Sequence, residues 1–243
     1  MIYTLDDFIR EYEKIVDMGW VRTHRAGPTG IGKTLEDLLG IPENNIDGPD
    51  FGEYELKSCR INSNSMLTMF TLSPLPRGAN TTLRLKYGYS SEAYDNDEKV
   101  LHATLSGDRF TRIADTGHFL KFTCRNDGIY IESENGVESI YWSRENLKKQ
   151  FEKKYKNKFI YAKADSRSEG VNEEFRFKEA WEVSGFNYDS FIKMLEAGKI
   201  YVDLRIGQYH GGPNNGKTHD HGTGFRVREY DQQFLFTVNN RIV

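Results

Sequence analysis

Apolar residues near the start of the chain recur at the spacing of a helix with one buried face. Thr4 and Asp7 have the spacing of a capping box, which opens a helix. Apolar side chains then follow at helical intervals: Phe8, Ile9, Tyr12, Ile15 and Val16. We expect Gly19 to end this helix. A second apolar stripe is formed by Leu35, Leu38 and Leu39, and it stops at Gly40, a residue type common just after helix ends.

Short apolar runs between turn residues predict strands in the middle of the chain. Residues 66–72 are expected to form a core strand of a central sheet, and 83–88 to carry basic residues beside glycine turns. Turn pairs at 127–128 and 135–136 separate three short runs and predict a β-meander over 119–122, 129–131 and 139–142. Ser143 is then expected to cap a helix that buries Leu147, Phe151 and Tyr155, before a strand at 159–162.

The last part of the chain predicts a helix followed by a hairpin. Asn187 or Asp189 is expected to open the helix, and Gly198 to end it. The segments expected after it are a strand at 199–209, a turn at 210–216, a returning strand at 218–228 and a closing segment at 233–238.

Length, charge and cysteine content say more about the partners and the cellular compartment of this chain than about its fold. Its 243 residues suffice for one large domain or two small lobes. The net charge of −3 argues mildly against a nucleic-acid partner, yet residues 144–158 carry seven basic and two acidic side chains. Cys59 and Cys124 indicate neither a metal site nor a disulfide framework. We find no signal peptide and no apolar run that could span a membrane, so we expect a cytoplasmic protein.

Residues 27–34 match the phosphate-loop pattern of nucleotide-binding proteins. Such a loop needs a buried hydrophobic strand directly before it, but residues 20–25 are mostly polar and basic. Residues 200–203 could mimic the partner strand that binds Mg²⁺, although their continuation into Arg205 does not favour that role. The other interpretation is a glycine-rich turn before a helix whose first N–H groups, with Lys33, approach a DNA phosphate.

The stretch 49–57, Pro-Asp-Phe-Gly-Glu-Tyr-Glu-Leu-Lys, combines two carboxylates with a lysine. Glu55 and Lys57 point the same way if this stretch is extended, because strand side chains alternate between faces. Gly52 permits a bend that brings Asp50 to the same side. Carboxylate oxygens are ligands that Mg²⁺ prefers. The alternative interpretation is a solvated strand with ordinary surface charge.

This stretch and its neighbours resemble the MvaI/BcnI restriction endonucleases, the MvaI type more closely, which are in turn similar to the repair nicking enzyme MutH. The Pro-Asp…Glu-x-Lys pattern looks like the PD-(D/E)XK nuclease signature, and the other matching segments are 27–40, 73–80, 203–207 and 216–226. The resemblance is weak over about 90–183. It implies an α+β fold: a mixed central sheet flanked by helices, with a second, β-rich recognition lobe. We place the catalytic lobe at 1–165, including the meander, and the recognition lobe at 166–243.

The resemblance also implies roles in catalysis. Asp50 and Glu55, with the Leu56 carbonyl, are expected to bind Mg²⁺, for which Mn²⁺ could substitute, whereas Ca²⁺ is expected to inhibit. Lys57 is expected to orient the attacking water. A glutamate on the helix before the motif points into the active site of MutH-like nucleases, and Glu36 holds that position here. Its alternative role is that of an ordinary surface carboxylate.

A recognition surface is expected near the end of the chain. Asp203 and Arg205 share a strand face, and such side chains can read cytosine N4 and guanine O6 and N7. His219 and His221 share a face with Asp220 opposite, a pattern that could also be structural or bind metal. The positions implied by the resemblance to contact double-stranded DNA are Asp203, Arg205, His219, Asp220, His221 and Arg226, with Lys33 and Arg77 toward phosphates.

The resemblance implies the function of a type II restriction endonuclease. It would hydrolyse phosphodiester bonds at a CCNGG-type site, with CCWGG favoured, and leave 5′-phosphate ends. It would act as a monomer, without membrane or nucleotide, beside a DNA methyltransferase of the same site specificity. A MutH-like nicking repair enzyme, a nucleotide-binding protein and a DNA-binding module with an inactive nuclease site are the alternatives.

Overall fold

The computed structural model describes residues 2–42, 49–61, 66–93, 96–169 and 172–243. The chain divides into two compact units. The first contains Met1–Ser65, Tyr155–Phe186 and Phe236–Val243, and the second contains Met66–Lys154 and Asn187–Leu235. This division differs from the expected single boundary between 1–165 and 166–243. The strands β9 (Lys158–Glu169) and β10 (Asn172–Ser184) pair along their length, so residue 165 lies inside a hairpin.

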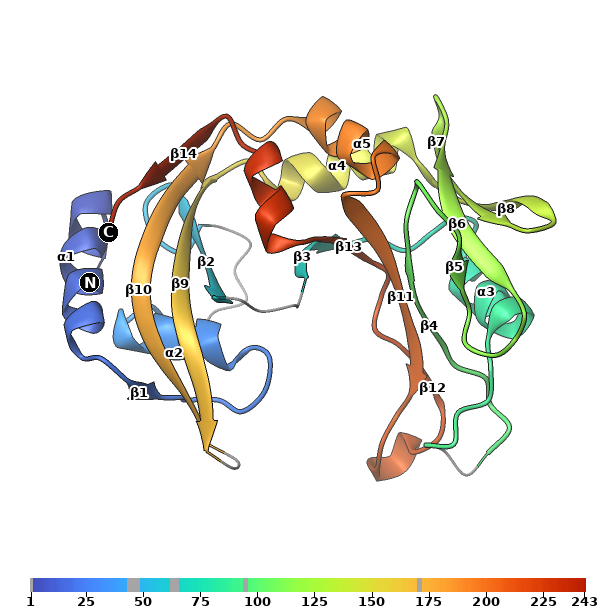
Figure 1. The fold of residues 1–243 in the computed structure, drawn as a ribbon, viewed down its shortest axis with the longest axis horizontal. Coiled ribbons are helices and arrows are strands. Elements are labelled where there is room, and N and C mark those ends of the chain that lie inside the picture. Colours follow the sequence, from blue (N-terminus) through green and yellow to red (C-terminus); the bar gives the residue numbers. More distant parts are fainter. Residues whose placement is uncertain (1, 43–48, 62–65, 94–95, 170–171) are drawn as a thin grey trace. The chain divides into compact units, whose positions relative to one another are not determined.

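The first unit is built on a mixed sheet with the strand order β1-β10-β9-β2, and β14 pairs with β10 as well (Figure 1). Its other elements are α1 (Leu5–Asp17), β1 (Val21–Arg22), α2 (Gly30–Leu38), β2 (Tyr54–Arg60) and β14 (Val238–Arg241). The pair β2–β9 is parallel and the remaining pairs are antiparallel. The expected mixed central sheet is therefore confirmed.

Helices α1 and α2 cover one face of this sheet. The capping box predicted at Thr4 is present, with the Asp7 N–H donating to Thr4 Oγ1 over 3.1 Å. Phe8 and Leu35 are fully buried in one core with Leu56, which points inward from β2. Each large apolar side chain buried in this way stabilises the unit by about 1.5–3 kcal/mol. Because Leu56 points into this core, its neighbours Glu55 and Lys57 are directed to the opposite face of the sheet.

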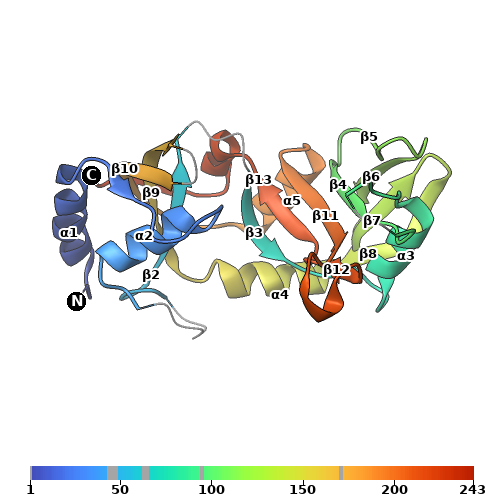
Figure 2. The ribbon, with the colours of Figure 1, turned by 90° about the horizontal axis from the view of Figure 1, so that it is seen from below.

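The second unit contains two sheets. One has the order β12-β11-β13-β3, with β4 on the other edge of β11, and the other is the meander β5-β6-β7-β8. The meander and α3 lie on one side of β4 and β11 (Figure 2). The strands are β3 (Leu67–Thr71), β4 (Leu101–Leu105), β5 (Thr111–Arg112), β6 (Phe119–Cys124), β7 (Gly128–Ser133), β8 (Gly136–Ser143), β11 (Ile200–Gln208), β12 (Thr218–Asp220) and β13 (Gly224–Val227). The helices are α3 (Ala79–Tyr87), α4 (Arg144–Lys154), α5 (Tyr188–Glu196) and the short 3₁₀ helices Gly212–Asn214 and Glu229–Phe234.

Several sequence expectations for the second unit are confirmed and others are wrong. The meander, α4 and α5 occur where they were predicted, and Asn187 caps α5 through Asp189 and Ser190 N–H groups. The strand expected at 66–72 is β3, but it pairs with β13 in the second unit and so lies outside the sheet that contains β2. Residues 83–88, for which only basic residues beside glycine turns were expected, belong to helix α3 and its cap, and Leu83 and Tyr87 bury one side of this helix.

The returning strand expected at 218–228 is broken into β12 and β13, and both pair with the same edge of β11. The segment 233–238 is the end of a 3₁₀ helix and the start of β14. No helix in the described ranges combines the length and the apolar character that crossing a membrane requires.

Candidate active site and recognition face

A tight bend places Asp50 beside β2. The Asp50 N–H donates to the Tyr54 carbonyl over 2.9 Å, and Phe51 forms an isolated bridge with Tyr54. Gly52 lies in this bend at φ +49°, where a Cβ atom would come within 2.8 Å of the Tyr3 carbonyl oxygen. Only glycine fits both the backbone angle and the space. The bend predicted from Gly52 is therefore present.

The Asp50 carboxylate is turned toward the edge of β2. Its Oδ2 accepts a hydrogen bond of 2.6 Å from the Leu56 N–H. β2 is the last strand of the sheet, so this N–H belongs to its outer edge. The N–H and C=O of one strand residue point to the same edge. The Leu56 carbonyl is therefore directed to the side on which Asp50 lies.

Glu55 and Lys57 are joined directly on the open face of β2. Lys57 Nζ lies 2.7 Å from Glu55 Oε1, and the two side chains are 36% and 28% exposed. Lys57 Nζ also lies 5.9 Å from the ring centre of Phe159, on the neighbouring strand β9. The pair is thus held over an apolar floor but is still open to a ligand from solvent.

Electrostatic interactions connect Asp50 to this pair. Although Asp50 as a residue is exposed, its carboxylate is partly shielded from water, and this desolvation is the main reason that its pKa is raised. The Leu56 N–H lowers the pKa, the Glu55 charge raises it and the Lys57 charge lowers it. The three groups of the motif are therefore close enough to interact. Two carboxylates balanced by one ammonium leave a net negative charge that favours a divalent cation.

Two tyrosine hydroxyl groups near Glu55 are kept neutral. Burial raises the pKa of Tyr155 and of Tyr161, and the negative charge of Glu55 adds to both increases. These phenols therefore add no negative charge to the site.

Glu36 is half-buried on α2, and its carbonyl accepts the Ile41 N–H over 2.9 Å. Helix α2 packs on β2, since a Cβ atom on Gly32 would lie 3.6 Å from Ser58 Oγ. Within the described ranges, no three His, Cys, Asp or Glu side chains are grouped so that they could hold a metal ion. The structure therefore does not bring Glu36 together with Asp50 and Glu55 as a third ligand.

The segment that resembles a phosphate loop is a turn anchored by Arg60. The guanidinium of Arg60 donates to the carbonyls of Pro28 and Gly27 over 3.2 and 3.4 Å and forms two hydrogen bonds to Glu173. The strand before the turn, β1, has two residues and pairs with β10 antiparallel. Lys33 Nζ lies 2.8 Å from Asp37 Oδ1. The buried strand that a nucleotide-binding loop requires is therefore not formed here.

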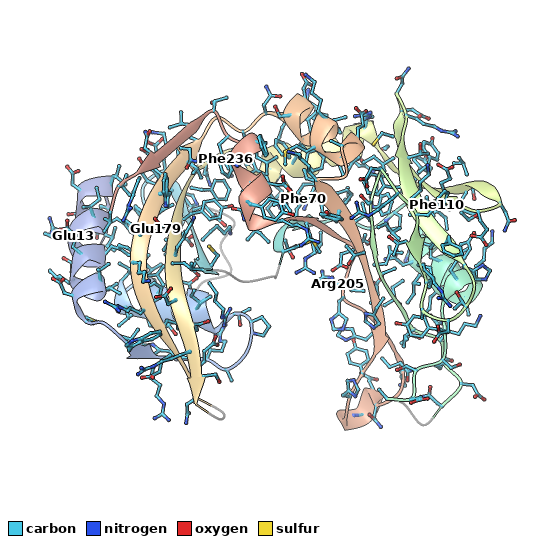
Figure 3. The ribbon with its side chains drawn as sticks, in the orientation of Figure 1. Glu13, Phe70, Phe110, Glu179, Arg205 and Phe236 are labelled. Atoms are coloured by element: carbon cyan, nitrogen blue, oxygen red, sulfur yellow. The ribbon has the colours of Figure 1, made fainter. Side chains whose placement is uncertain are left out.

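Most of the expected recognition residues of the second unit lie on one face of β11, and Arg205 on this face points away from the meander (Figure 3). Asp203 is only 7% exposed. Its Oδ1 accepts a 2.8 Å bond from Thr104 and its Oδ2 a 2.8 Å bond from Arg226. Arg226 also donates to the Met66 carbonyl over 2.8 Å. The partner of Asp203 is therefore Arg226, although the sequence suggested a functional pair with Arg205.

Arg205 is oriented by backbone carbonyls. Its Nε donates to Gly222 and its Nη2 to His221, each over 3.2 Å. Gly224 lies directly beside the guanidinium, since a Cβ atom there would be 3.6 Å from Arg205 Nη2. Such a fixed guanidinium keeps its planar fork ready for bidentate hydrogen bonding.

A stack of rings continues this face. The ring of His219 lies 4.0 Å from that of Tyr209 and 3.9 Å from that of His221, measured between centres. Burial lowers the pKa of His221, and the nearby His219, Arg205 and His102 lower it further. His221 is therefore held toward its neutral form, which has one donor and one acceptor.

Asp220 and Arg77 lie apart from these residues. Asp220 is paired with Ile206, so it points to the other face of the sheet, as the alternation predicted. Its carboxylate accepts bonds from Asn80 Nδ2 over 2.6 Å and from the Gly222 N–H over 2.8 Å. Arg77 is exposed just before α3. Sequence reasoning missed Thr104 and Asn80, because each acts through a partner about 100 or more residues away.

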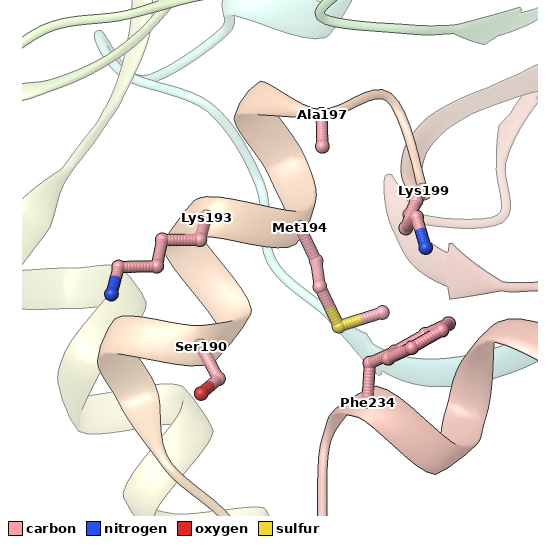
Figure 4. Close-up of a pocket in the computed structure, with 6 residues that line it drawn as sticks. All are labelled: Ser190, Lys193, Met194, Ala197, Lys199 and Phe234. Atoms are coloured by element: carbon pink, nitrogen blue, oxygen red, sulfur yellow. The ribbon is translucent and has the colours of Figure 1, made fainter.

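A pocket of about 260 Å³ in the second unit contains none of the predicted site residues. It lies beside α5 and is lined by Ser190, Lys193, Met194, Ala197, Lys199 and Phe234 (Figure 4). Lys199 Nζ lies 3.7 Å from the ring centre of Phe234 and 3.4 Å from Asp231 Oδ1. The ammonium group of Lys199 is thus neutralised locally by Asp231, and the motif and the face on β11 are the stronger candidates.

Comparisons with protein families and with solved structures agree with one another. The chain matches the MvaI/BcnI restriction endonuclease family over residues 9–236. It is 36% identical to MvaI restriction endonuclease in a complex with its cognate DNA substrate, with a TM-score of 0.85 and 100% of both chains covered. The structure of MvaI in the absence of DNA is matched at the same 36% identity with a TM-score of 0.62, covering 100% of this chain and 99% of that one. No curated protein sequence gives a significant match. The family match spans both the motif on β2 and the face on β11, and the chain belongs to the MvaI/BcnI restriction endonuclease family.

Proposed function

We propose that this restriction endonuclease hydrolyses phosphodiester bonds of double-stranded DNA in a Mg²⁺-dependent reaction at Asp50, Glu55 and Lys57. The observation that carries the proposal is the grouping of these side chains on one strand, where Asp50 accepts from the Leu56 N–H over 2.6 Å and Lys57 Nζ lies 2.7 Å from Glu55. Membership of the family makes the chain a site-specific DNA endonuclease. Among the described residues, the group of Asp50, Glu55 and Lys57 offers the carboxylate oxygens and the ammonium that suit phosphodiester hydrolysis.

The donor set on β2 fits a hard divalent cation. Asp50 and Glu55 offer carboxylate oxygens, and the Leu56 carbonyl faces the same edge. These three residues would hold Mg²⁺, which prefers oxygen ligands and retains several waters. Mn²⁺ would substitute, and Ca²⁺ would support DNA binding while inhibiting cleavage. When bound, the cation would stabilise phosphate charge and make a bound water more acidic.

Lys57 contributes a cation that the protein itself positions. Its ammonium is held by Glu55 at 2.7 Å and lies over the Phe159 ring, so it reaches the open face in a restricted set of positions. From there it would orient the attacking water by hydrogen bonding and offset the negative charge that develops on the phosphate. Glu36, on the helix packed against β2, is proposed as a further acidic residue that acts beside the site and not as a third ligand of the cation. The products would carry 5′-phosphate and 3′-hydroxyl ends.

The face on β11 is the proposed reader of the DNA sequence. Arg205 has a fixed guanidinium, and Arg226, Asp203, His219 and His221 lie on the same side of the sheet. Arginine forks read guanine in the major groove. We propose a CCNGG-type site, with A or T in the centre, from the resemblance to MvaI. Lys33, Arg77 and Asp220 would contribute at its margins.

We further propose that the enzyme acts as a monomer in the cytoplasm and cuts the two strands in separate events. A DNA methyltransferase of the same specificity would be its functional partner rather than a subunit. These statements follow the family resemblance.

Digestion of a sequenced supercoiled plasmid tests the proposal. Mg²⁺ should yield discrete fragments, and sequencing of their ends should show one recurring CCWGG site and 5′-phosphates. Asp50→Asn, Glu55→Gln and Lys57→Ala should each abolish cleavage while binding of the same site persists in Ca²⁺. Glu53→Gln is a matched control, because Glu53 lies in the same bend but pairs with Lys158 at 2.7 Å and is 62% exposed. Full cleavage by Lys57→Ala would refute the assigned site.

A further inference from the structure

His102 is an exposed residue in the middle of β4, and β4 was not foreseen from the sequence. Its strand neighbours Leu101 and Ala103 are buried, so His102 projects from the opposite side of the strand. In the antiparallel pairing of β4 with β11, His102 lies directly across from Arg205. Directly opposed residues of such a pair have Cβ atoms about 4.5–5.5 Å apart. His102 therefore belongs to the same face as the arginine.

The next position on β4 shows that this strand takes part in the face. Thr104 lies across from Asp203 in the same register and donates to its Oδ1 over 2.8 Å. Thr104 thus holds a residue of the face in place, whereas His102 extends from the strand into solvent. Both β4 residues project from the same side of the strand, but Thr104 is bonded to a residue of the face and His102 is exposed to solvent.

His102 also lies close enough to the histidine rings to interact with them electrostatically. It lowers the pKa of His221, as His219 and Arg205 do. The ring of His221 itself lies 3.9 Å from that of His219. Three imidazoles and one guanidinium thus share a single patch built from β4, β11, β12 and the residue after β12.

We propose that His102 is a specificity-determining residue that contacts a base edge in the major groove beside the base read by Arg205. The inference rests on the proposed recognition of DNA by this face. A neutral imidazole offers one donor and one acceptor, which suit guanine O6 or N7 and cytosine N4 respectively. Successive base pairs are about 3.4 Å apart along a strand. A residue about 5 Å from Arg205 therefore reaches the same base pair or the adjacent one.

The test is a competition assay in Ca²⁺ at fixed salt, with the cognate duplex mapped by plasmid digestion and a set of duplexes that each change one base pair. His102→Ala should lower affinity for the cognate duplex about 5- to 20-fold, as the loss of one or two net hydrogen bonds implies. Affinity for a scrambled duplex should change less than about twofold, because phosphate contacts dominate nonspecific binding. His102→Gln should recover part of the loss, since its amide also donates and accepts.

The pattern across the duplex set decides the assignment. His102→Ala should relax discrimination at the base pair that Arg205→Ala relaxes, or at its neighbour. His118→Ala is the control, because His118 belongs to the same unit but pairs with Glu134 on the meander at 3.0 Å. Equal weakening on cognate and scrambled duplexes, no change, or relaxation at a distant base pair would each overturn the role of His102. A wild-type protein that fails to distinguish the duplexes would instead overturn the proposed recognition face as a whole.

Discussion

The pair of Asp203 and Arg226 offers a direct test of how the proposed recognition face is built. Asp203 is 7% exposed and accepts hydrogen bonds from both Thr104 and Arg226. The Nε atom of Arg226 is buried and has no hydrogen-bond partner among the described residues. Asp203→Asn keeps the size of the side chain and one acceptor. It removes the negative charge beside the guanidinium and places an amide NH₂ group near it. We therefore expect a less stable second unit and a disordered face.

The size of the effect follows from the burial of the two side chains. Breaking one partner of a fully buried ion pair costs about 3–5 kcal/mol. The Arg226 side chain keeps 24% of its exposure and its bond to the Met66 carbonyl, which favours a lower value of about 2–3 kcal/mol. For a chain of this size, each kcal/mol lowers the melting temperature by about 2–4 °C. Asp203→Asn should therefore lower the melting temperature by about 4–12 °C.

Thermal unfolding followed by Trp142 fluorescence measures the loss of stability in the second unit. Trp142 is buried in the second unit, whereas Trp20 and Trp181 belong to the first. With Trp20 and Trp181 replaced by Phe, the signal reports the second unit alone. Adding Arg226→Met to Asp203→Asn should recover part of the loss, because removing both charges costs less than leaving one unpaired. An Asp203→Asn melting temperature within about 1 °C of the parent, or strictly additive single effects, would show that the two residues do not stabilise one another.

Three further predictions concern the two sites separately. Arg205→Ala should weaken binding of the cognate duplex in Ca²⁺ by about one to two orders of magnitude and that of a scrambled duplex far less; equal losses would make Arg205 a phosphate contact. Asp50→Asn should raise the melting temperature at pH 7. The folded-state pKa of Asp50 is raised above 3.8, so the contribution of this carboxyl group to folding stability is fully present below pH 3.8 and is lost as pH rises through the folded-state pKa. The difference from wild type should shrink in melts below pH 4, and a constant difference would contradict the electrostatic cause. Gly52→Ala should reduce both stability and cleavage, because its Cβ atom would meet the Tyr3 carbonyl at 2.8 Å, whereas Gly32→Ala in α2 should be tolerated in the same assays.

Local signals explain what the sequence could predict. The capping box of α1 needs Thr4 and Asp7 only, and both of its hydrogen bonds are present. The alternation of Glu55, Leu56 and Lys57 along β2 is a property of any strand, and the bend at Gly52 needs a glycine. The geometry of the proposed catalytic motif could therefore be predicted from nine consecutive residues.

Long-range pairing explains what the sequence could not predict. Residues 172–184 alternate irregularly, and the register of β10 shifts between Phe177 and Glu179, which hides its strand pattern. β3 reads as a strand, but its sheet is set by β13, whose residues lie more than 150 positions later. The choice of Arg226 over Arg205 as the partner of Asp203 depends on the pairing of β13 with β11, which places Arg226 across from Tyr201, two residues from Asp203 on the same strand. None of these choices is encoded in neighbouring residues.

The connectivity separates the proposed recognition strands from the sheet that carries the proposed catalytic motif. The chain leaves the first unit after β2 and returns in β9, which is the parallel neighbour of β2. It leaves again after β10 and returns in β14, which pairs with the end of β10 from Ser184 to Trp181. Each excursion therefore starts and ends on adjacent strands of one sheet. β4, β11 and β13 pair with no strand of that sheet. We therefore expect substitutions in these three strands to change the proposed reading of DNA sequence while Asp50, Glu55 and Lys57 keep their geometry.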